Sequence, residues 1–294
     1  MPEAAAGGAP PPPLPPAAAG TGTGTGASVL VLGGGPAGAT AALQLARLGH
    51  RVQLVERDDG PAAGAGAGHL AESLPASLGP LFARLGVLAA VDHAGFLRPA
   101  RAQVDWPGLP PDSAAPTAMG QDEGRGWLVD RWQFAALLRA AAWRAGVHAV
   151  AGHAGPPERL GGGWQVTLRP AGGGGARRLS ADLVVDARGR RAWPATGPAT
   201  VTLLALWAPG PAAHDADPRM RIQAGRSAWY WYAPLPGGAV NVGVFVDARR
   251  VAGLGQNAQS ALYHALLRDA PLLAPLLAGR HATAVRTCDA TPRG

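Results

Sequence analysis

Residues 28–38 read SVLVLGGGPAG, and this stretch decides the fold. Its first five residues form a short apolar run, which is typical of a parallel strand buried on both faces. The residues after it match the GxGxxG spacing through Gly33, Gly35 and Gly38. A run of helix formers and a second apolar run, 52–56, follow. The pattern predicts a strand, a tight turn, a helix and a second strand, which open a doubly wound α/β domain.

Each glycine of this pattern has a distinct physical reason. Gly33 permits the tight turn, Gly35 lets a pyrophosphate approach the backbone, and Gly38 lets the helix pack closely on the strand. Free N–H groups around Ala37, in the first turn of the helix, would face the phosphates. The competing interpretation is an ordinary glycine-rich loop in a glycine-rich chain.

Glu56 strengthens the interpretation as a dinucleotide site. It ends the second predicted strand, 18 residues after Gly38, where a carboxylate can accept hydrogen bonds from ribose hydroxyls. A carboxylate there would repel the 2′-phosphate of NADP. Arg57 follows directly and places a cation beside the phosphates.

The composition excludes several classes of protein. The net charge is +7, but only 15% of the residues are charged, and every one of the 26 cations is arginine. These arginines are scattered rather than gathered in one stripe, so we expect no nucleic-acid binding. The single cysteine, Cys288, excludes an internal disulfide, and the eight histidines show no metal-ligand spacing. We therefore expect no metal site.

The ends and segments of the chain predict its organisation. Residues 1–26, rich in Pro, Gly and Thr, predict a disordered leader without a secretory signal. No apolar run approaches about 18 residues, so we expect a cytoplasmic protein with no membrane span. The dinucleotide-binding domain is predicted at 27–96 plus 128–198, and a substrate domain at 97–127 plus 199–250. Residues 251–294 predict a helical return toward the first of these domains.

The second half of the chain has strand periodicity. Residues 201–207, 219–224, 228–233 and 240–246 alternate with a period of two, which predicts a β-rich unit. Residues 229–234 read WYWYAP, and alternation places Trp229 and Trp231 on one face of their strand. These two rings form either ordinary packing within a hairpin or one wall of an apolar pocket for an aromatic substrate.

Together these segments resemble a known family. The chain resembles the FAD-dependent monooxygenases of the hydroxybenzoate-hydroxylase type, and within them the tryptophan-halogenase-like group, over residues 28–294. That group includes the flavoproteins that mature tryptophylquinone cofactors and is related to the geranylgeranyl reductases. The resemblance implies an α/β fold with a Rossmann-like FAD-binding domain, an inserted β-rich substrate domain, and FAD as the cofactor.

The resemblance also assigns roles to residues outside the glycine pattern. It implies that Arg57 and Arg131 touch the FAD phosphates or the ribityl chain. Asp130 and Arg131 open an amphipathic helix that is predicted over 128–145. Asp186 and Gly189 match the Asp-Ala-Thr-Gly end of a family strand, although Arg188 replaces the threonine.

Two further segments resemble family motifs imperfectly. Residues 72–75, ESLP, resemble the Gly-Glu-Ser-x-Pro segment near the flavin, with Ala71 in place of the glycine. The alternative for Glu72 is a carboxylate at a helix start. Residues 229–234 resemble the Trp-x-Trp-x-Ile-Pro motif of halogenases, with Ala233 in place of the isoleucine.

The chain contains no lysine, and family halogenation depends on one. The segment most similar to the lysine-bearing one begins at 96–99, FLRP, which puts Arg98 at the lysine position. A guanidinium stays protonated and cannot replace an amine as a nucleophile. We therefore predict a monooxygenase acting on an aromatic substrate, such as an indole or a peptide-borne tryptophan, and not a halogenase. No residue stands out as a catalytic base.

Partners and alternatives complete the predictions. Electrons would come from a separate flavin reductase or from NAD(P)H, because no second GxGxxG is present. The chain lacks the Gly-Asp motif that the family carries near the flavin, so we expect a C-terminally truncated chain. The alternatives are a geranylgeranyl-reductase-type flavoprotein and a non-catalytic remnant.

Overall fold

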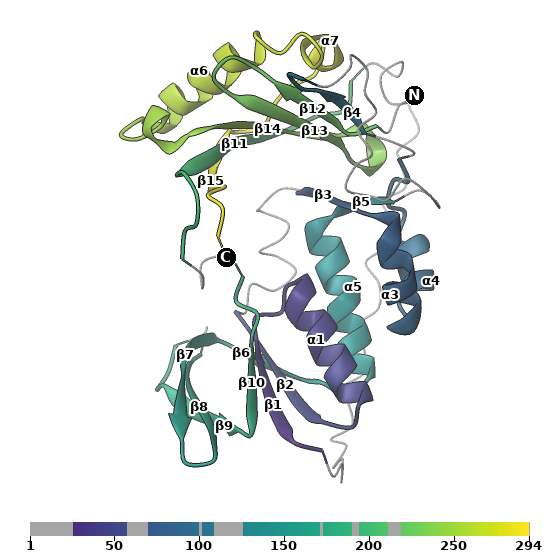
Figure 1. Cartoon of the computed structure of the whole chain (residues 1–294), viewed down its shortest axis with the longest axis vertical. Helices are drawn as coiled ribbons and strands as arrows, with labels where there is room; N and C mark the ends of the chain where they lie inside the picture. Colours follow the sequence, from purple (N-terminus) through teal and green to yellow (C-terminus); the bar gives the residue numbers. More distant parts are fainter. Residues whose placement is uncertain are drawn as a thin grey trace, which may run out of the picture.

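The computed structural model describes residues 26–57, 70–99, 102–108, 126–170, 173–189, 194–210 and 219–293. The described chain forms two units, which lie one above the other in Figure 1. The lower unit holds a parallel sheet with two long helices on one face. The upper unit holds a six-stranded sheet with helices on its far side.

The first unit is built on a parallel sheet in the order β10-β1-β2-β6. These strands are β1 (Ser28–Leu32), β2 (Arg51–Glu56), β6 (His148–Ala151) and β10 (Leu183–Asp186). The helices α1 (Pro36–Arg47) and α5 (Arg131–Arg144) cover one face. A three-stranded antiparallel sheet packs on the other face through Leu30, Leu32 and Val55; it consists of β7 (His153–Leu160), β8 (Gly163–Arg169) and β9 (Arg177–Ala181).

Alternation along β1 explains this two-sided burial. Val29 and Val31 belong to the core under the helices, whereas Leu30 and Leu32 belong to the core under the antiparallel sheet. A strand buried on both faces therefore reads as a continuous apolar run. This confirms the predicted α/β fold with a Rossmann-like arrangement.

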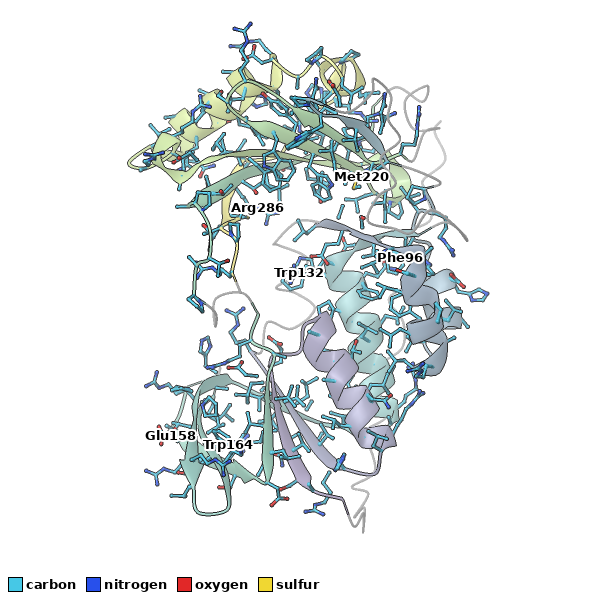
Figure 2. All side chains as sticks on the ribbon, viewed as in Figure 1. Phe96, Trp132, Glu158, Trp164, Met220 and Arg286 are labelled. Carbon is cyan, nitrogen blue, oxygen red and sulfur yellow. The ribbon has the colours of Figure 1, made fainter. Side chains whose placement is uncertain are left out.

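A small two-stranded sheet extends the first unit toward the second. It pairs β3 (Ala71–Leu74) with β5 (Trp127–Asp130) in antiparallel register, which places Glu72 opposite Val129. The short helices η1 (Ala76–Leu78), α3 (Gly79–Arg84) and α4 (Leu88–Asp92) lie beside it. Phe96 packs in the same core as α5, 6.4 Å from Phe134 between ring centroids (Figure 2).

The second unit is a mixed sheet in the order β15-β11-β14-β13-β12-β4. Its strands are β4 (Gln103–Asp105), β11 (Thr200–Trp207), β12 (Arg221–Ala224), β13 (Trp229–Pro234), β14 (Val240–Asp247) and β15 (Arg286–Asp289). The single turns η4 (Pro236–Gly238) and η5 (Ala248–Arg250) follow β13 and β14. The helices α6 (Gln256–Leu267) and α7 (Ala274–Leu277) cover the far face.

The end of the described chain corrects one prediction. Residues 251–294 were expected to return to the first unit, but α6 and α7 pack on the second sheet and β15 pairs with β11 inside it. The physical reason is the apolar back of that sheet, against which Tyr263, Leu266 and Leu267 are buried.

One further boundary differs from the predictions. The helix expected over 128–145 begins at Arg131, because residues 127–130 form β5 and Asp130 caps the helix by accepting from the N–H groups of Trp132 and Gln133. The leader, up to residue 25, lies outside the described residues. No helix among the described residues is both long and apolar enough to cross a membrane.

Candidate functional site

The glycine-rich turn joins β1 to α1 at the carboxyl edge of the parallel sheet. The Gly33 N–H donates to the Val55 carbonyl at 2.7 Å, and Gly33 has a φ of 102°, which favours glycine. A Cβ on Gly38 would lie 1.8 Å from the Gly33 carbonyl oxygen. The chain can therefore pack the start of α1 against the turn only with glycine at position 38.

Gly35 differs from its neighbours because the space around it is open. A Cβ on Gly35 would meet no atom within 4 Å, whereas one on Gly34 would collide with the Glu56 side chain. Gly35 is also the N-cap residue of α1, and Pro36, at the first helical position, has no N–H. The helix start thus presents its backbone donors, near Ala37, to an open space. Such a cradle fits the pyrophosphate of FAD.

Glu56 lies at the end of β2, next to this turn. Its carboxylate accepts hydrogen bonds from the Gly34 N–H and, at 3.1 Å, from the Arg57 N–H. Glu56 and the turn thus lie together, as the sequence predicts. Arg57, the next residue, is exposed. A carboxylate held there is placed for a ribose.

Arg139 is a neighbour of the turn that sequence analysis missed. It projects from the middle of α5, and its Nη1 donates to the Gly34 carbonyl at 3.0 Å. Burial lowers the pKa of Arg139, and the nearby Glu56 carboxylate opposes that effect. The sequence does offer one indication of this role: Arg139 is the single charged residue in the apolar stretch 134–142. Burying a charge there costs free energy unless the charge finds a partner.

Asp186 and Gly189 lie beside the turn, because β10 is the neighbour of β1. The Ala187 N–H donates to the Leu32 carbonyl at 2.8 Å, and a Cβ on Gly33 would lie 2.5 Å from the Ala187 carbonyl oxygen. Asp186 forms an ion pair with Arg188 at 2.6 Å, and the hydrogen bond from Arg188 lowers the pKa of Asp186. Gly189 follows with a φ of 84°.

Arg131 begins α5 and is paired with Glu72. Its Nη1 lies 2.6 Å from Glu72 Oε1, and both side chains are partly exposed. Glu72 belongs to β3, so the alternative interpretation as a carboxylate at a helix start is wrong. The ion pair joins the segment resembling the family's flavin-side motif to the helix that carries Arg131.

A buried asparagine ties β3 to the second sheet. Asn241 on β14 has no exposed surface, and its Oδ1 accepts from the Ala71 N–H at 2.5 Å. This contact and the apolar cluster of Ala71, Ala233 and Leu235 place the Glu72 segment against the second unit. Asn241 was not singled out from sequence, because nothing in its local pattern distinguishes it from other strand residues.

Trp229 and Trp231 share one face of β13, as predicted, and Tyr230 and Tyr232 share the other. The tyrosines are buried under α6, where the Tyr230 hydroxyl donates to the Leu266 carbonyl. Trp229 stacks on Phe245 of β14, with ring centroids 3.5 Å apart, and lies edge-to-face with Trp106.

Trp231 lies further along the same face and joins two apolar clusters between the units. One cluster contains Val104, Leu128 and Met220, and the other contains Ala71 and Ala233. Trp231 is half-buried there. Hairpin packing thus accounts for the part of this face that carries Trp229.

Arg98 points away from this face. Its Nη1 lies 2.6 Å from Asp92 Oδ1, and its guanidinium carbon lies 4.4 Å from the centre of the Trp127 ring. The preceding residue, Leu97, packs instead in the cluster that contains Trp231. Alternation of the extended chain explains why neighbours face opposite sides.

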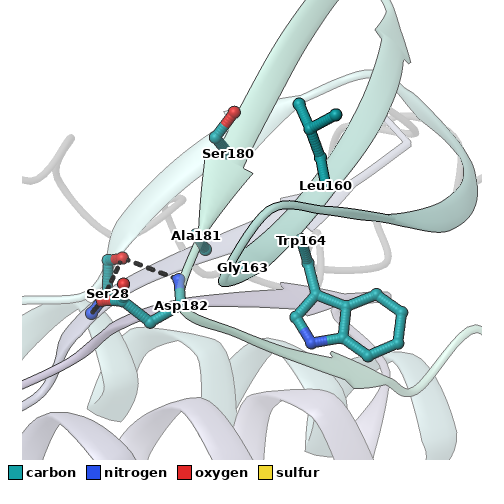
Figure 3. Close-up of a pocket in the computed structure, with 7 residues that line it drawn as sticks. All are labelled: Ser28, Leu160, Gly163, Trp164, Ser180, Ala181 and Asp182. Atoms are coloured by element: carbon teal, nitrogen blue, oxygen red, sulfur yellow. Dashed lines mark hydrogen bonds between the residues drawn. The ribbon is translucent and has the colours of Figure 1, made fainter.

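A separate pocket of about 260 Å³ lies at the opposite end of β1 (Figure 3). It is lined by Trp164, Leu160 and a hydrogen-bonded pair in which the Ser28 hydroxyl donates to Asp182 at 2.7 Å. The start of a parallel strand is the edge remote from the glycine-rich turn, so this pocket is distinct from the dinucleotide cradle. Within the described ranges, no three His, Cys, Asp or Glu residues are grouped to hold a metal.

Two family models together match residues 28–287 of the chain. The model described as FAD dependent oxidoreductase matches residues 28–109, and the model described as tryptophan halogenase matches residues 110–287. The flavin-dependent halogenase armH3 of Armillaria mellea is 30% identical over 247 residues, which cover 72% of this chain and 45% of that protein. The tryptophan 2-halogenase of Chondromyces crocatus is 43% identical over 77 residues, or 26% of this chain and 14% of that protein.

Solved structures show the same fold. The flavin-dependent halogenase CmlS is 22% identical with a TM-score of 0.74, and the match covers 90% of this chain and 50% of the CmlS chain. The peptidyl tryptophan dihydroxylase QhpG is 29% identical with a TM-score of 0.64, and covers 92% of this chain and 57% of its own. The chain therefore spans about half the length of the relatives it matches. Together with the open cradle at Gly35, these matches show that the chain belongs to the tryptophan halogenase family of FAD-dependent oxidoreductases.

Proposed function

We propose that the protein is an FAD-dependent monooxygenase that acts on an aromatic substrate, such as an indole or a peptide-borne tryptophan, and that it is not a halogenase. The observation that carries this proposal is the environment of Arg98. The resemblance puts Arg98 at the family's lysine position, and the Arg98 guanidinium is bound to Asp92 and stacked on Trp127. It is directed away from the face that carries Trp231, so it offers no nucleophilic nitrogen there.

The residues of the first unit would hold the cofactor. The backbone N–H groups at Gly35 and the start of α1 would bind the pyrophosphate, in a turn whose shape depends on Gly33 and Gly38, and Glu56 would bind the ribose. Arg131 would contact the phosphates or the ribityl chain while its partner Glu72 fixes its direction. FAD, when bound and reduced, supplies the electrons that reduce O₂.

The face of the second sheet would orient the substrate. Trp229 and Trp231 lie on the side of β13 opposite α6, and Trp231 packs toward the first unit. Flat aromatic walls of this kind bind planar rings and exclude water. The likeness to a peptidyl tryptophan dihydroxylase supports a peptide-borne indole. A separate flavin reductase or NAD(P)H would supply the reductant, and a cytoplasmic location fits that supply.

The decisive experiment supplies the chain with FAD, a flavin reductase, NADH, O₂ and a tryptophan-containing peptide, with and without bromide. We expect mass spectrometry to find oxygen from isotope-labelled O₂ in the peptide, in equal yield with and without the halide. Trp229→Leu should lower the yield, whereas Trp143→Leu, at an exposed tryptophan of α5, should not. A bromide-dependent brominated product would show that the protein is a halogenase. If neither an oxygenated nor a brominated peptide forms, that result would also contradict the proposal.

A further inference from the structure

We propose that Arg139 is a positioning residue for the diphosphate of the bound dinucleotide, because it turns the N–H of Gly35 toward that diphosphate. The inference rests on the binding of FAD by the glycine-rich turn. It assigns a role to a residue of α5, which lies outside the GxGxxG pattern altogether.

The contacts of Gly34 carry the first step. The carbonyl of Gly34 accepts from Arg139 Nη1 at 3.0 Å, and the N–H of Gly34 donates to the Glu56 carboxylate. Both backbone polar groups of Gly34 are thus held by charged side chains from different elements, α5 and β2. Hydrogen bonds to charged groups are about twice as strong as neutral ones, so the orientation of this residue is well defined.

Peptide geometry carries the second step. The described chain contains no cis peptide bond, so the Gly34 carbonyl and the Gly35 N–H point in opposite directions across one planar unit. Because Arg139 draws the carbonyl toward α5, the Gly35 N–H points away from α5. Among the glycines of this turn, Gly35 is the one where an added Cβ would meet no atom within 4 Å, so a phosphate oxygen can approach the backbone there.

Charge carries the third step. Arg139 lies half-buried beside the start of α1, where the helix already favours an anion. Glu56 lies near enough to oppose part of the effect of burial on Arg139, and both side chains are held at Gly34. The guanidinium thus stays charged beside the turn, where it would favour an anion. Arg139 therefore contributes to binding through the orientation of a backbone donor and through its own charge.

The test compares ADP with adenosine, since the two ligands share the nucleoside and differ in the diphosphate. Calorimetric titration of the full chain gives both affinities for wild type, Arg139→Met, Arg139→Lys and Arg144→Met. Arg144 is the matched control because it is an exposed arginine in the last turn of the same helix. Thermal unfolding of each variant reports whether it folds.

We expect Arg139→Met to weaken ADP binding about tenfold to a hundredfold, which is the effect of losing a charge-assisted hydrogen bond. Adenosine binding should change by less than about twofold, and Arg139→Lys should restore most of the ADP affinity because it keeps a charged donor. Arg144→Met should bind both ligands as wild type does.

Two results would overturn the inference. One is unchanged ADP affinity in Arg139→Met; the other is an equal loss for ADP and adenosine, which would assign Arg139 to the fold alone. If Arg139→Met does not fold, Arg139→Gln, which also removes the charge, takes its place, and equal losses of ADP and adenosine affinity in that variant have the same meaning. Failure of the wild-type chain to bind either ADP or FAD would instead overturn the cofactor assignment, and this inference with it.

Discussion

At the scale of single residues, the ion pair between Asp186 and Arg188 makes stability depend on pH. The hydrogen bond from Arg188 lowers the pKa of Asp186 below its ordinary value of about 3.9. The stabilisation is therefore fully present above the unfolded pKa and is lost as the pH falls through the lower folded pKa. We expect Arg188→Gln to reduce the loss of stability between pH 7 and pH 3 in urea unfolding. Arg178→Gln, at an exposed arginine of β9, is the control, and equal acid sensitivity in both variants would contradict the prediction.

At the scale of elements, two glycines at the junction of α1 and the glycine-rich turn have different roles, one in folding and one in cofactor binding. We expect Gly38→Ala to destabilise the protein by about 1–3 kcal/mol, because its methyl would collide with the Gly33 carbonyl. Gly35→Ala should change stability by less than about 1 kcal/mol, since its methyl meets open space, but should weaken FAD binding by about 1–3 kcal/mol by blocking donors to a charged phosphate. Thermal unfolding and titration of FAD by fluorescence quenching check the pair. Equal FAD affinity in Gly35→Ala and wild type would show that the pyrophosphate does not bind at this turn.

At the scale of the whole molecule, Trp231 joins the two units. It packs against apolar clusters that contain residues of both, whereas the core under α6 belongs to the second unit alone. We expect Trp231→Ala to cost about 2–4 kcal/mol and to split one calorimetric unfolding transition into two. Leu266→Ala, in the core under α6, is the control: it should lower the stability of the protein but leave a single unfolding transition. A single, lower transition in Trp231→Ala would show that the units stay coupled without it.

Local chemistry made part of the site predictable. Gly33, Gly38 and Glu56 could be identified because a turn between a buried strand and a helix imposes spacing that is visible along the chain. The alternation of Trp229 and Trp231 was predictable for the same reason, since the period of a strand is fixed by its backbone. Asp130 and the helix after it belong to this group as well, although the helix begins three residues later than predicted.

Contacts between distant segments were not predictable. Arg139 lies 105 residues from the Gly34 carbonyl that it binds, and Asn241 lies 170 residues from Ala71. The strands β3 and β4 are too short to show a period, and they exist because partners from elsewhere in the chain complete their hydrogen bonds.

By itself, the sequence determined the α/β class, the dinucleotide turn and the resemblance to the flavin-dependent family, because each depends on residues that are neighbours along the chain. Only the tertiary structure decided that residues 256–289 complete the second unit rather than the first, that Arg98 faces Asp92, and that Arg139 reaches the turn. These outcomes depend on which apolar surfaces meet and which buried polar groups find partners. A local pattern can indicate that a residue is buried, but which partner covers it is a property of the folded chain as a whole.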